Sequence, residues 1–171
     1  PAEVAAITPA QIATYSAAQI VALDVNIQYL TNPTLGAMLN TQVNAITATE
    51  IGVLSPAQVR LIGSTGAGGA TTTSKVTSLN PGAWAALVGN PTQVAAITPA
   101  ETATMSIAEI TALGTNIQHL SNAALGAFIA GVTFNQVGSI SAAQIAVLSP
   151  AQVRFIGSTG AGGVTTTSKI N

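Results

Sequence analysis

Residues 8–23 decide the fold: they read Thr8-Pro9-Ala10-Gln11-Ile12-Ala13-Thr14-Tyr15, then Ser16-Ala17-Ala18-Gln19-Ile20-Val21-Ala22-Leu23. Each eight-residue unit begins with a hydroxyl residue, whose oxygen suits a helix N-cap because it accepts a bond from a free backbone N–H. Proline suits the next position, where its missing N–H costs nothing. The glutamine three residues after the hydroxyl reaches back to the N-cap and closes a capping box. Each unit therefore predicts a helix start.

Apolar residues in these units recur at spacings of five and three. Ile7 before the cap and Ile12 four residues after it match a hydrophobic staple, while Ile12 and Tyr15 share one helical face. The next cap arrives after about two helical turns, and helices this short are unstable alone. The pattern predicts a mainly α fold, built as solenoid-like modules of very short capped helices with a period of about eight residues.

The same signal recurs along the chain. Asn80-Pro-Gly-Ala-Trp84 and Asn90-Pro-Thr-Gln93 predict further helix starts, whereas the units near Asp24, Asn40 and Gly114 depart from the pattern. The residues predicted to form structural caps are Thr8, Gln11, Ser16, Gln19, Ser55, Gln58, Thr98, Ser106, Ser149 and Gln152.

The chain is also a tandem duplication. Residues 4–10 recur as 94–100, and residues 54–60 recur as 148–154, so the offset grows from 90 to 94. We expect a first module over residues 1–89 and a second over residues 90–171. The first divides into a helical block (1–62), a Gly/Thr segment (63–79) and a linker helix (80–89), and the second into a helical block (90–156) and a Gly/Thr segment (157–171).

The Gly/Thr segments have two readings. Their glycines permit unusual backbone angles, and the Thr-Thr-Thr-Ser-Lys run favours extended structure, so each is either a flexible linker or a short β-strand that pairs with a neighbour. Trp84 has no counterpart in the second module, and it either packs between modules or contacts another molecule. The predicted assembly contacts are Gly66, Gly68, Lys75, Trp84, Gly160, Gly162 and Lys169.

Composition excludes several classes of function. Only 5% of the residues are charged and the net charge is −1, so the chain has no field to attract nucleic acid. The absence of cysteine excludes disulfides, thiolate metal sites and a cysteine nucleophile. Polar residues interrupt every apolar run, so we expect no transmembrane segment. A surface with so few charges repels its own copies weakly, which favours self-association.

The sequence offers no catalytic constellation. Glu50, Glu101 and Glu109 align with glutamines of the other module, as Glu3 does, which favours capping over acid–base chemistry. His119 aligns with Tyr29, and no second histidine or cysteine could complete a metal site. Residues 63–69 resemble a phosphate loop, but no Lys-Ser/Thr pair follows the last glycine. We therefore expect no enzyme activity, no cofactor and no metal.

The unit Thr/Ser-x-x-Gln-Ile/Val-x-x-Leu resembles repeats in bacterial secreted and cell-surface proteins of adhesin-like type. The resemblance implies a secreted or cell-surface location and a structural or adhesive role. The first hypothesis is a structural protein that self-assembles into a surface layer, matrix or fibre, with copies of itself as partner. The alternative is an adhesive module that binds carbohydrate, or ice, through a flat Ala/Thr/Ser/Gln face.

Overall fold

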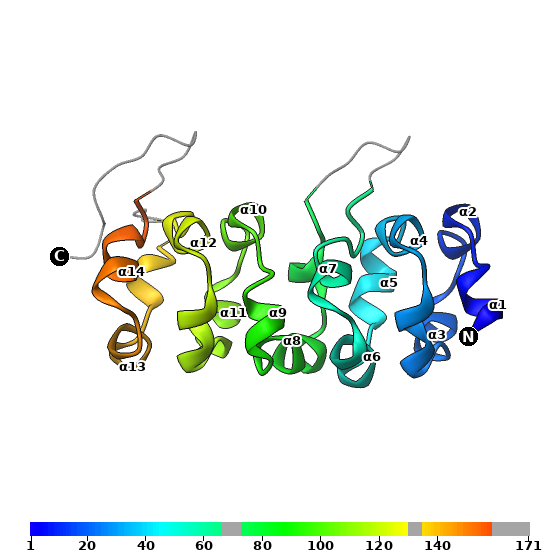
Figure 1. The fold of residues 1–171 in the computed structure, drawn as a ribbon, viewed down its shortest axis with the longest axis horizontal. Helices are drawn as coiled ribbons and strands as arrows, with labels where there is room; N and C mark the ends of the chain where they lie inside the picture. The colour runs from blue at the N-terminus through cyan, green and yellow to red at the C-terminus, as the bar shows by residue number, and fades with distance from the viewer. Residues whose placement is uncertain (66–72, 130–134, 159–171) are drawn as a thin grey trace. The chain divides into compact units, whose positions relative to one another are not determined.

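The computed structural model describes residues 1–65, 73–129 and 135–158, and it is mainly helical (Figure 1). The chain divides into two compact units, Pro1–Gln93 and Val94–Asn171. The predicted boundary between the modules lies between residues 89 and 90, near the division between the units. Within unit 1, Gln93 Nε2 donates to the carbonyl oxygens of Ile51 (2.7 Å) and Leu54 (2.9 Å).

Both units consist of short helices. In unit 1 these are α1 (Ala2–Ala5), α2 (Pro9–Ile12), α3 (Ala17–Val21), the 3-10 helix η1 (Asp24–Tyr29), α4 (Asn32–Gly36), α5 (Asn40–Ala45), α6 (Ala48–Val53), α7 (Pro56–Val59), η3 (Val76–Ser78) and α8 (Pro81–Val88). Helix α9 (Pro91–Val94) begins in unit 1 and ends on the first residue of unit 2. In unit 2 they are α10 (Pro99–Thr102), α11 (Ile107–Ala112), η4 (Gly114–His119), α12 (Asn122–Gly126), η5 (Val137–Ser139), α13 (Ala142–Ala146) and α14 (Pro150–Phe155).

The helix starts follow from local hydrogen bonding. At α2 the Thr8 hydroxyl accepts from Gln11 N (3.3 Å), and Gln11 Oε1 accepts from Thr8 N (2.8 Å). The other predicted cap residues form the same reciprocal pair, with glutamine or glutamate in the third helical position. Asn80 starts the linker helix α8 by accepting from Gly82 N and Ala83 N, both at 3.0 Å.

Two of the units that depart from the pattern begin 3-10 helices instead. Asp24 and Gly114 stand at equivalent places, after Leu23 and Leu113, and have positive φ angles of 47° and 49°. Only glycine, and to a lesser degree aspartate or asparagine, adopts this backbone conformation readily. The exchange of aspartate for glycine between the modules therefore reflects backbone geometry.

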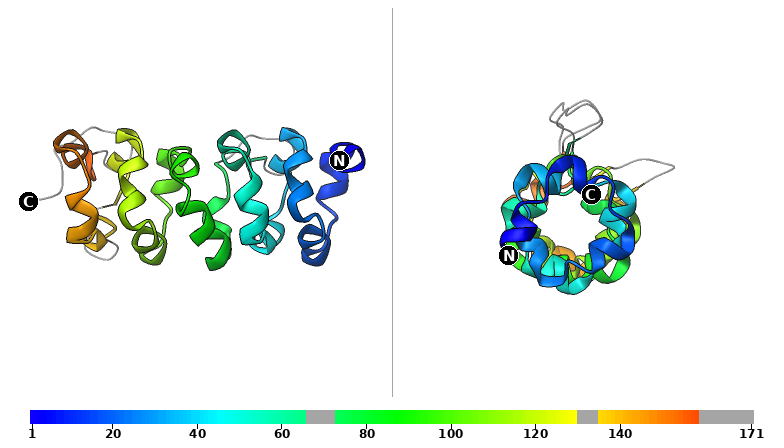
Figure 2. Two further views of the ribbon diagram at one scale, coloured as in Figure 1. Left: turned by 60° about the horizontal axis from the view of Figure 1, so that its bottom comes forward. Right: turned by 90° about the vertical axis from the view of Figure 1, so that its right-hand side faces the viewer.

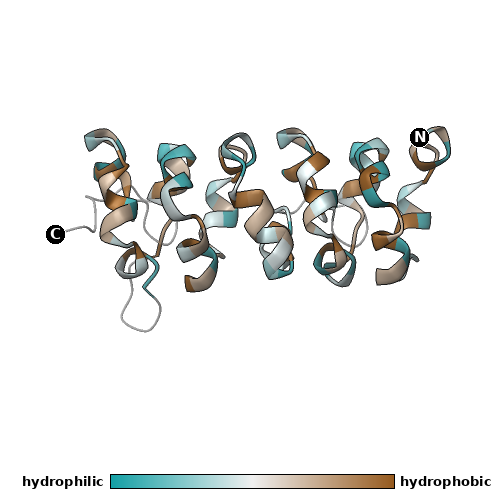
Figure 3. Cartoon of the chain, turned by 90° about the horizontal axis from the view of Figure 1, so that it is seen from below, coloured by the Kyte–Doolittle hydropathy of each residue, from teal (hydrophilic) through white to brown (hydrophobic). Residues whose placement is uncertain are grey.

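The helices of unit 1 form three layers, which we define as residues 1–30, 31–62 and 73–93. The first two layers pack through α2 on α4, α3 on α5 and η1 on α6, and the third packs through η3 on α5 and α8 on α6. Figure 2 shows these helices from two further sides. Polar and apolar residues are interleaved along most of the short helices (Figure 3).

The core of unit 1 is a row of apolar residues that recur every seven or eight positions. They lie one helical turn after each cap and are at most 1% exposed: Ile12, Ile20, Ile27, Leu35, Val43, Ile51 and Val59. The residues three positions later are buried too, except Tyr15, which is half-buried. Burial of this row supplies the stability that no single short helix has.

Unit 2 repeats the arrangement with two layers, residues 98–120 and 121–158. Its layers pack through α10 on α12, η4 on α13 and α11 on η5, and α12 also packs on α14. Ile110, Ile117, Leu125 and Phe128 are at most 1% exposed.

The ends of the first Gly/Thr segment fold back on unit 1. Gly63 has a φ of 62°, its N–H donates to Leu35 O (2.9 Å), and Lys75 N donates to Ile62 O (2.8 Å). The extended structure predicted for the Gly/Thr segments falls mainly on residues 66–72 and 159–171, which lie outside the described residues.

Candidate functional site

The feature that distinguishes this chain is a set of glutamine side chains that join one layer to the next. Gln42 occupies the third position of α5, and its Oε1 accepts from Leu39 N (2.8 Å) at the helix start. Its Nε2 donates to the carbonyl oxygens of Ile12 (2.6 Å) and Tyr15 (2.8 Å) in the first layer. One carboxamide thus caps its own helix and satisfies the carbonyls at the end of a helix in the neighbouring layer. We call such a contact an interlayer rung.

Rungs recur at equivalent positions in both units. In unit 1, Gln58 Nε2 donates to Gln28 O (2.8 Å), and Gln93 forms the rung described above. In unit 2 the donors and acceptors are Gln136 to Thr102 O and Met105 O, Gln144 to Ile110 O, and Gln152 to Gln118 O, at 2.7–3.0 Å. Of these seven acceptor carbonyls, all except that of Met105 lie in the last turn of a short helix or directly follow it, where few backbone N–H groups remain to bond them.

Asparagine and threonine make related contacts in unit 1. Asn80 Nδ2 donates to Asn44 O (2.9 Å) and Ile46 O (2.6 Å) while its Oδ1 caps α8. Thr34 Oγ1 donates to Ile7 O (2.8 Å). A short polar side chain at a helix start therefore serves two layers at once.

Residues 1–30, the first layer of unit 1, contain two glutamines of the rung type. Gln11 and Gln19 close their capping boxes through Oε1, but they are exposed, and no bond from either Nε2 is found among the described residues. By contrast, Gln42 and Gln144, which donate to carbonyls of an adjacent layer, are buried, with 1% and 2% of their surface exposed. Gln11 and Gln19 are therefore rung donors without an acceptor in the part of the chain that the structure describes.

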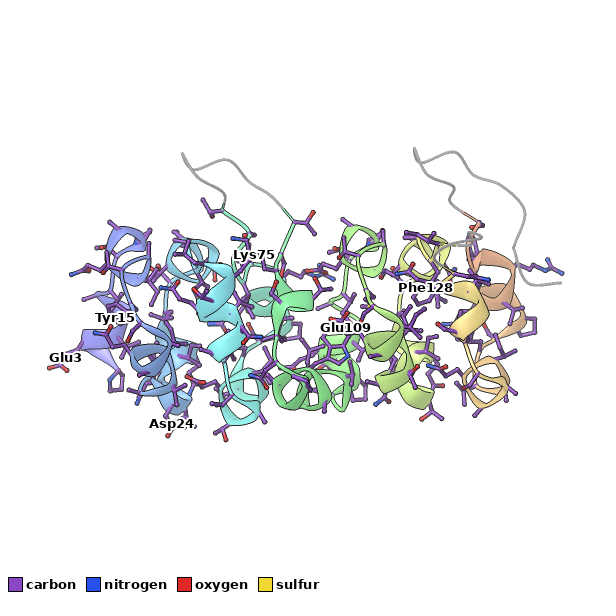
Figure 4. The ribbon with its side chains drawn as sticks, turned by 180° about the vertical axis from the view of Figure 1, so that it is seen from behind. Glu3, Tyr15, Asp24, Lys75, Glu109 and Phe128 are labelled. Carbon is purple, nitrogen blue, oxygen red and sulfur yellow. The ribbon has the colours of Figure 1, made fainter. Side chains whose placement is uncertain are left out.

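Glutamates occupy three positions of this type. Glu50, Glu101 and Glu109 stand third in α6, α10 and α11, and each accepts from the N-cap N–H, at 2.7, 2.6 and 2.7 Å. Glu3 differs, because α1 follows Pro1, which has no side-chain oxygen to complete a box. Figure 4 shows Glu3 and Asp24 at the edge of unit 1, pointing away from its body.

The structure assembles no metal centre from these acids. Within residues 1–65, 73–129 and 135–158, no group of three or more histidine or acidic residues could hold a metal ion. His119 ends η4 and is half-buried. These residues are distributed as caps and helix ends.

The predicted assembly contacts have separate surroundings. Lys75 Nζ lies 3.5 Å from Met38 O, so this lysine bonds a carbonyl within unit 1. Trp84 is 3% exposed on α8, which leaves little of its indole at the surface. Gly66, Gly68, Gly160, Gly162 and Lys169 lie outside the described residues.

The interlayer rungs are the feature of the candidate site that sequence reasoning missed. Glutamate and glutamine cap a helix equally well, so the capping argument alone does not explain why glutamine predominates at the third position. The preference for glutamine at residues 42, 58, 93, 136, 144 and 152 was the available signal, because only the amide can also donate.

Comparison with protein-family models, with curated proteins and with solved structures finds no match. Among the described helices, none has the length and apolar character needed to cross a membrane.

Proposed function

We propose that this chain is a non-catalytic structural repeat protein that self-assembles end to end, outside the cell, into a layer, matrix or fibre. In this proposal each layer is one turn of a solenoid, and the contact between successive turns is also the contact between successive molecules. The observation that carries it is the pair of exposed rung donors, Gln11 and Gln19, on the first layer.

The chemistry of these two residues favours another layer as their partner. Each has its Oε1 engaged at a helix start, in the same geometry as the buried Gln42 and Gln144. In both buried cases the acceptor is a backbone carbonyl in an adjacent layer of the same kind. A second copy of the chain offers such carbonyls without any change of sequence.

The surface favours association as well. The charged residues are few and nearly balanced, so two copies meet little electrostatic repulsion. Val21, Val25 and Tyr29 in the first layer are 45%, 39% and 43% exposed. Their aligned counterparts in unit 2 are threonines and His119, so at these three positions the first layer of unit 1 is the more apolar of the two.

The location outside the cell rests on the resemblance of the eight-residue unit to repeats of secreted and cell-surface proteins. A heteropolymer partner is not required, since the repeated layers supply both the donor and the acceptor side of the contact.

The test is negative-stain electron microscopy together with light scattering over a range of concentrations. We expect ordered filaments or sheets from the unmodified chain. The double variant Gln11→Glu/Gln19→Glu should remain folded by circular dichroism, because both side chains are exposed and a carboxylate keeps the capping oxygen. It should lose assembly, because a carboxylate has no N–H to donate and would place a charged oxygen against the docking carbonyl.

The matched control places the same two charges on unit 2. Thr111 and Thr115 are exposed, so Thr111→Glu/Thr115→Glu adds equal charge away from the first layer of unit 1 and should leave assembly intact. Separate particles at every concentration, in this chain and in chains lengthened by further modules, would contradict the proposed function.

A further inference from the structure

One interlayer position lacks the amide that its equivalents have. The second layer of unit 1 carries three candidate donors spaced eight residues apart, at positions 42, 50 and 58. Gln42 and Gln58 donate to carbonyls 30 residues earlier. The residue between them is Glu50, and the equivalent residue of unit 2 is Gln144, which donates to Ile110 O.

Glu50 has the position of a rung donor. The side chain is fully buried at 0% exposure. Its Oε2 accepts from Thr47 N (2.7 Å), as Gln144 Oε1 accepts from Ser141 N (2.9 Å). Its other oxygen, Oε1, therefore stands where Gln144 has its Nε2. That atom is buried and has no hydrogen-bond partner among the described residues.

The acceptor for a donor at this place is already defined by the repeat. Ile20 aligns with Ile110, and the two carbonyls have the same local role: Leu23 N donates to Ile20 O (2.9 Å) and Leu113 N to Ile110 O (3.2 Å). In unit 2 the second lone pair of that carbonyl accepts from Gln144. An ionised carboxylate at position 50 could not form a hydrogen bond with Ile20 O, because both groups are acceptors and neither has a proton to donate.

The charges around Glu50 also disfavour ionisation. Helix α6 packs against η1 and α8. The titratable side chains of η1 are Asp24 and Tyr29, and α8 has none. Burial raises the pKa of Glu50, and the charge of Asp24 raises it further, whereas the bonds from Thr47 lower it; the net direction is upward from 4.5. No cation faces it from these elements.

We propose that Glu50 is a neutral carboxylic acid in the folded protein and that its proton forms the missing rung, from Oε1 to the backbone oxygen of Ile20. The carboxylic acid thus replaces a carboxamide of the same shape, with O–H in the place of N–H. This inference concerns the folded chain alone and does not depend on assembly.

The consequence is a proton held by the folded state and released on unfolding. Because the pKa is raised in the folded state, unfolding above pH 4.5 releases the proton, and the folded state loses stability as the pH rises. Below the ordinary pKa of glutamate, the rung contributes fully to the stability of the folded state. Between that value and the folded pKa of Glu50, the folding equilibrium constant falls by at most about tenfold per pH unit.

The experiment compares three chains by chemical denaturation from acid to alkaline pH. Glu50→Gln restores the amide. The stability of this variant relative to the unmodified chain should therefore increase with pH between the ordinary glutamate pKa and the folded pKa of Glu50. The matched variant Gln144→Glu places a second carboxyl at the equivalent position of unit 2. In acid this variant should be as stable as the parent. As the pH rises, its folding equilibrium constant should fall, relative to that of the parent, by up to about tenfold per pH unit.

Infrared spectroscopy supplies a readout that does not depend on stability. The folded parent at neutral pH should show the carbonyl stretch of a protonated carboxyl, and Glu50→Gln should lack it. Absence of this band in the folded parent, or an advantage of Glu50→Gln that is constant over the whole pH range, would overturn the proposal.

Discussion

The side-chain amide of Gln42 lies 2.6 Å from the carbonyl oxygen of Ile12, thirty residues earlier in the chain. The same amide group caps its own helix through Oε1. A helix of four to six residues leaves most of its terminal backbone groups without partners within the helix. The rungs resolve this for two helices at once, which is why helices too short to persist alone are stable in this chain.

Asn80 should be the most sensitive asparagine of unit 1. Asn80→Ala removes the cap of α8 and leaves the carbonyls of Asn44 and Ile46 without their donor, so we expect a loss of about 2–4 kcal/mol in the free energy of unfolding. Asn80→Asp keeps the cap and loses only the donor, so its free energy of unfolding should lie between those of the unmodified chain and Asn80→Ala. Equal stability of all three chains in urea would show that the interlayer bonds contribute nothing.

The positive φ angles of Asp24 and Gly114 predict opposite responses at aligned positions. Asp24→Gly should leave the protein as stable or slightly more stable, because glycine adopts this conformation without strain. Gly114→Ala should cost about 1–2 kcal/mol, since an L side chain is disfavoured there even though its Cβ meets no atom within 4 Å. Thermal unfolding of both variants measures the difference, and a stabilising Gly114→Ala would refute the backbone explanation.

Two glycines of unit 1, Gly63 and Gly52, should respond in opposite directions to alanine. At Gly63, with φ of 62°, an added Cβ would lie 3.0 Å from Met38 O and 2.7 Å from the Lys75 side chain, so Gly63→Ala should cost about 2 kcal/mol or more. At Gly52, within α6, nothing lies within 4 Å, and alanine is the better helix former by about 1 kcal/mol. Gly52→Ala should therefore raise the midpoint of denaturation, and a fall would contradict the described environment.

Asp24 should modulate the pH dependence of stability through Glu50. Its negative charge adds to the effect of burial in raising the pKa of Glu50. Asp24→Asn removes that charge, and asparagine tolerates the same backbone angles. The pKa of Glu50 should then move down towards 4.5, so the loss of stability between acid and neutral pH should become smaller. A larger pH dependence in Asp24→Asn would contradict this assignment.

The capping boxes could be predicted from the sequence because they are local. Thr8, Pro9 and Gln11 lie within four residues, and their chemistry leaves little choice of backbone. The duplication was evident for the same reason, since matched segments such as residues 54–60 and 148–154 can be compared directly.

The contacts between layers could not be predicted in the same way. Gln93 bonds carbonyls 39 and 42 residues away, a distance in sequence that no local rule sets. The positive φ of Asp24 was also missed, because the unit around it departs from the repeat pattern that predicts the helix starts. Glu50 was predicted as a cap, which it is, but its burial depends on the packing of η1 and α8 around α6.

The central claim is that the glutamine amide holds adjacent layers together, and the pair Gln42→Glu and Gln11→Glu tests it most directly. Both changes keep the capping oxygen and remove the donor, but only Gln42 has an acceptor in the described chain. The measurement is the free energy of unfolding in urea at about pH 9, where a carboxyl at position 42 is most readily ionised. We predict a loss of about 2–4 kcal/mol for Gln42→Glu and a change within about 0.5 kcal/mol for Gln11→Glu. Equal effects of the two substitutions would contradict the claim.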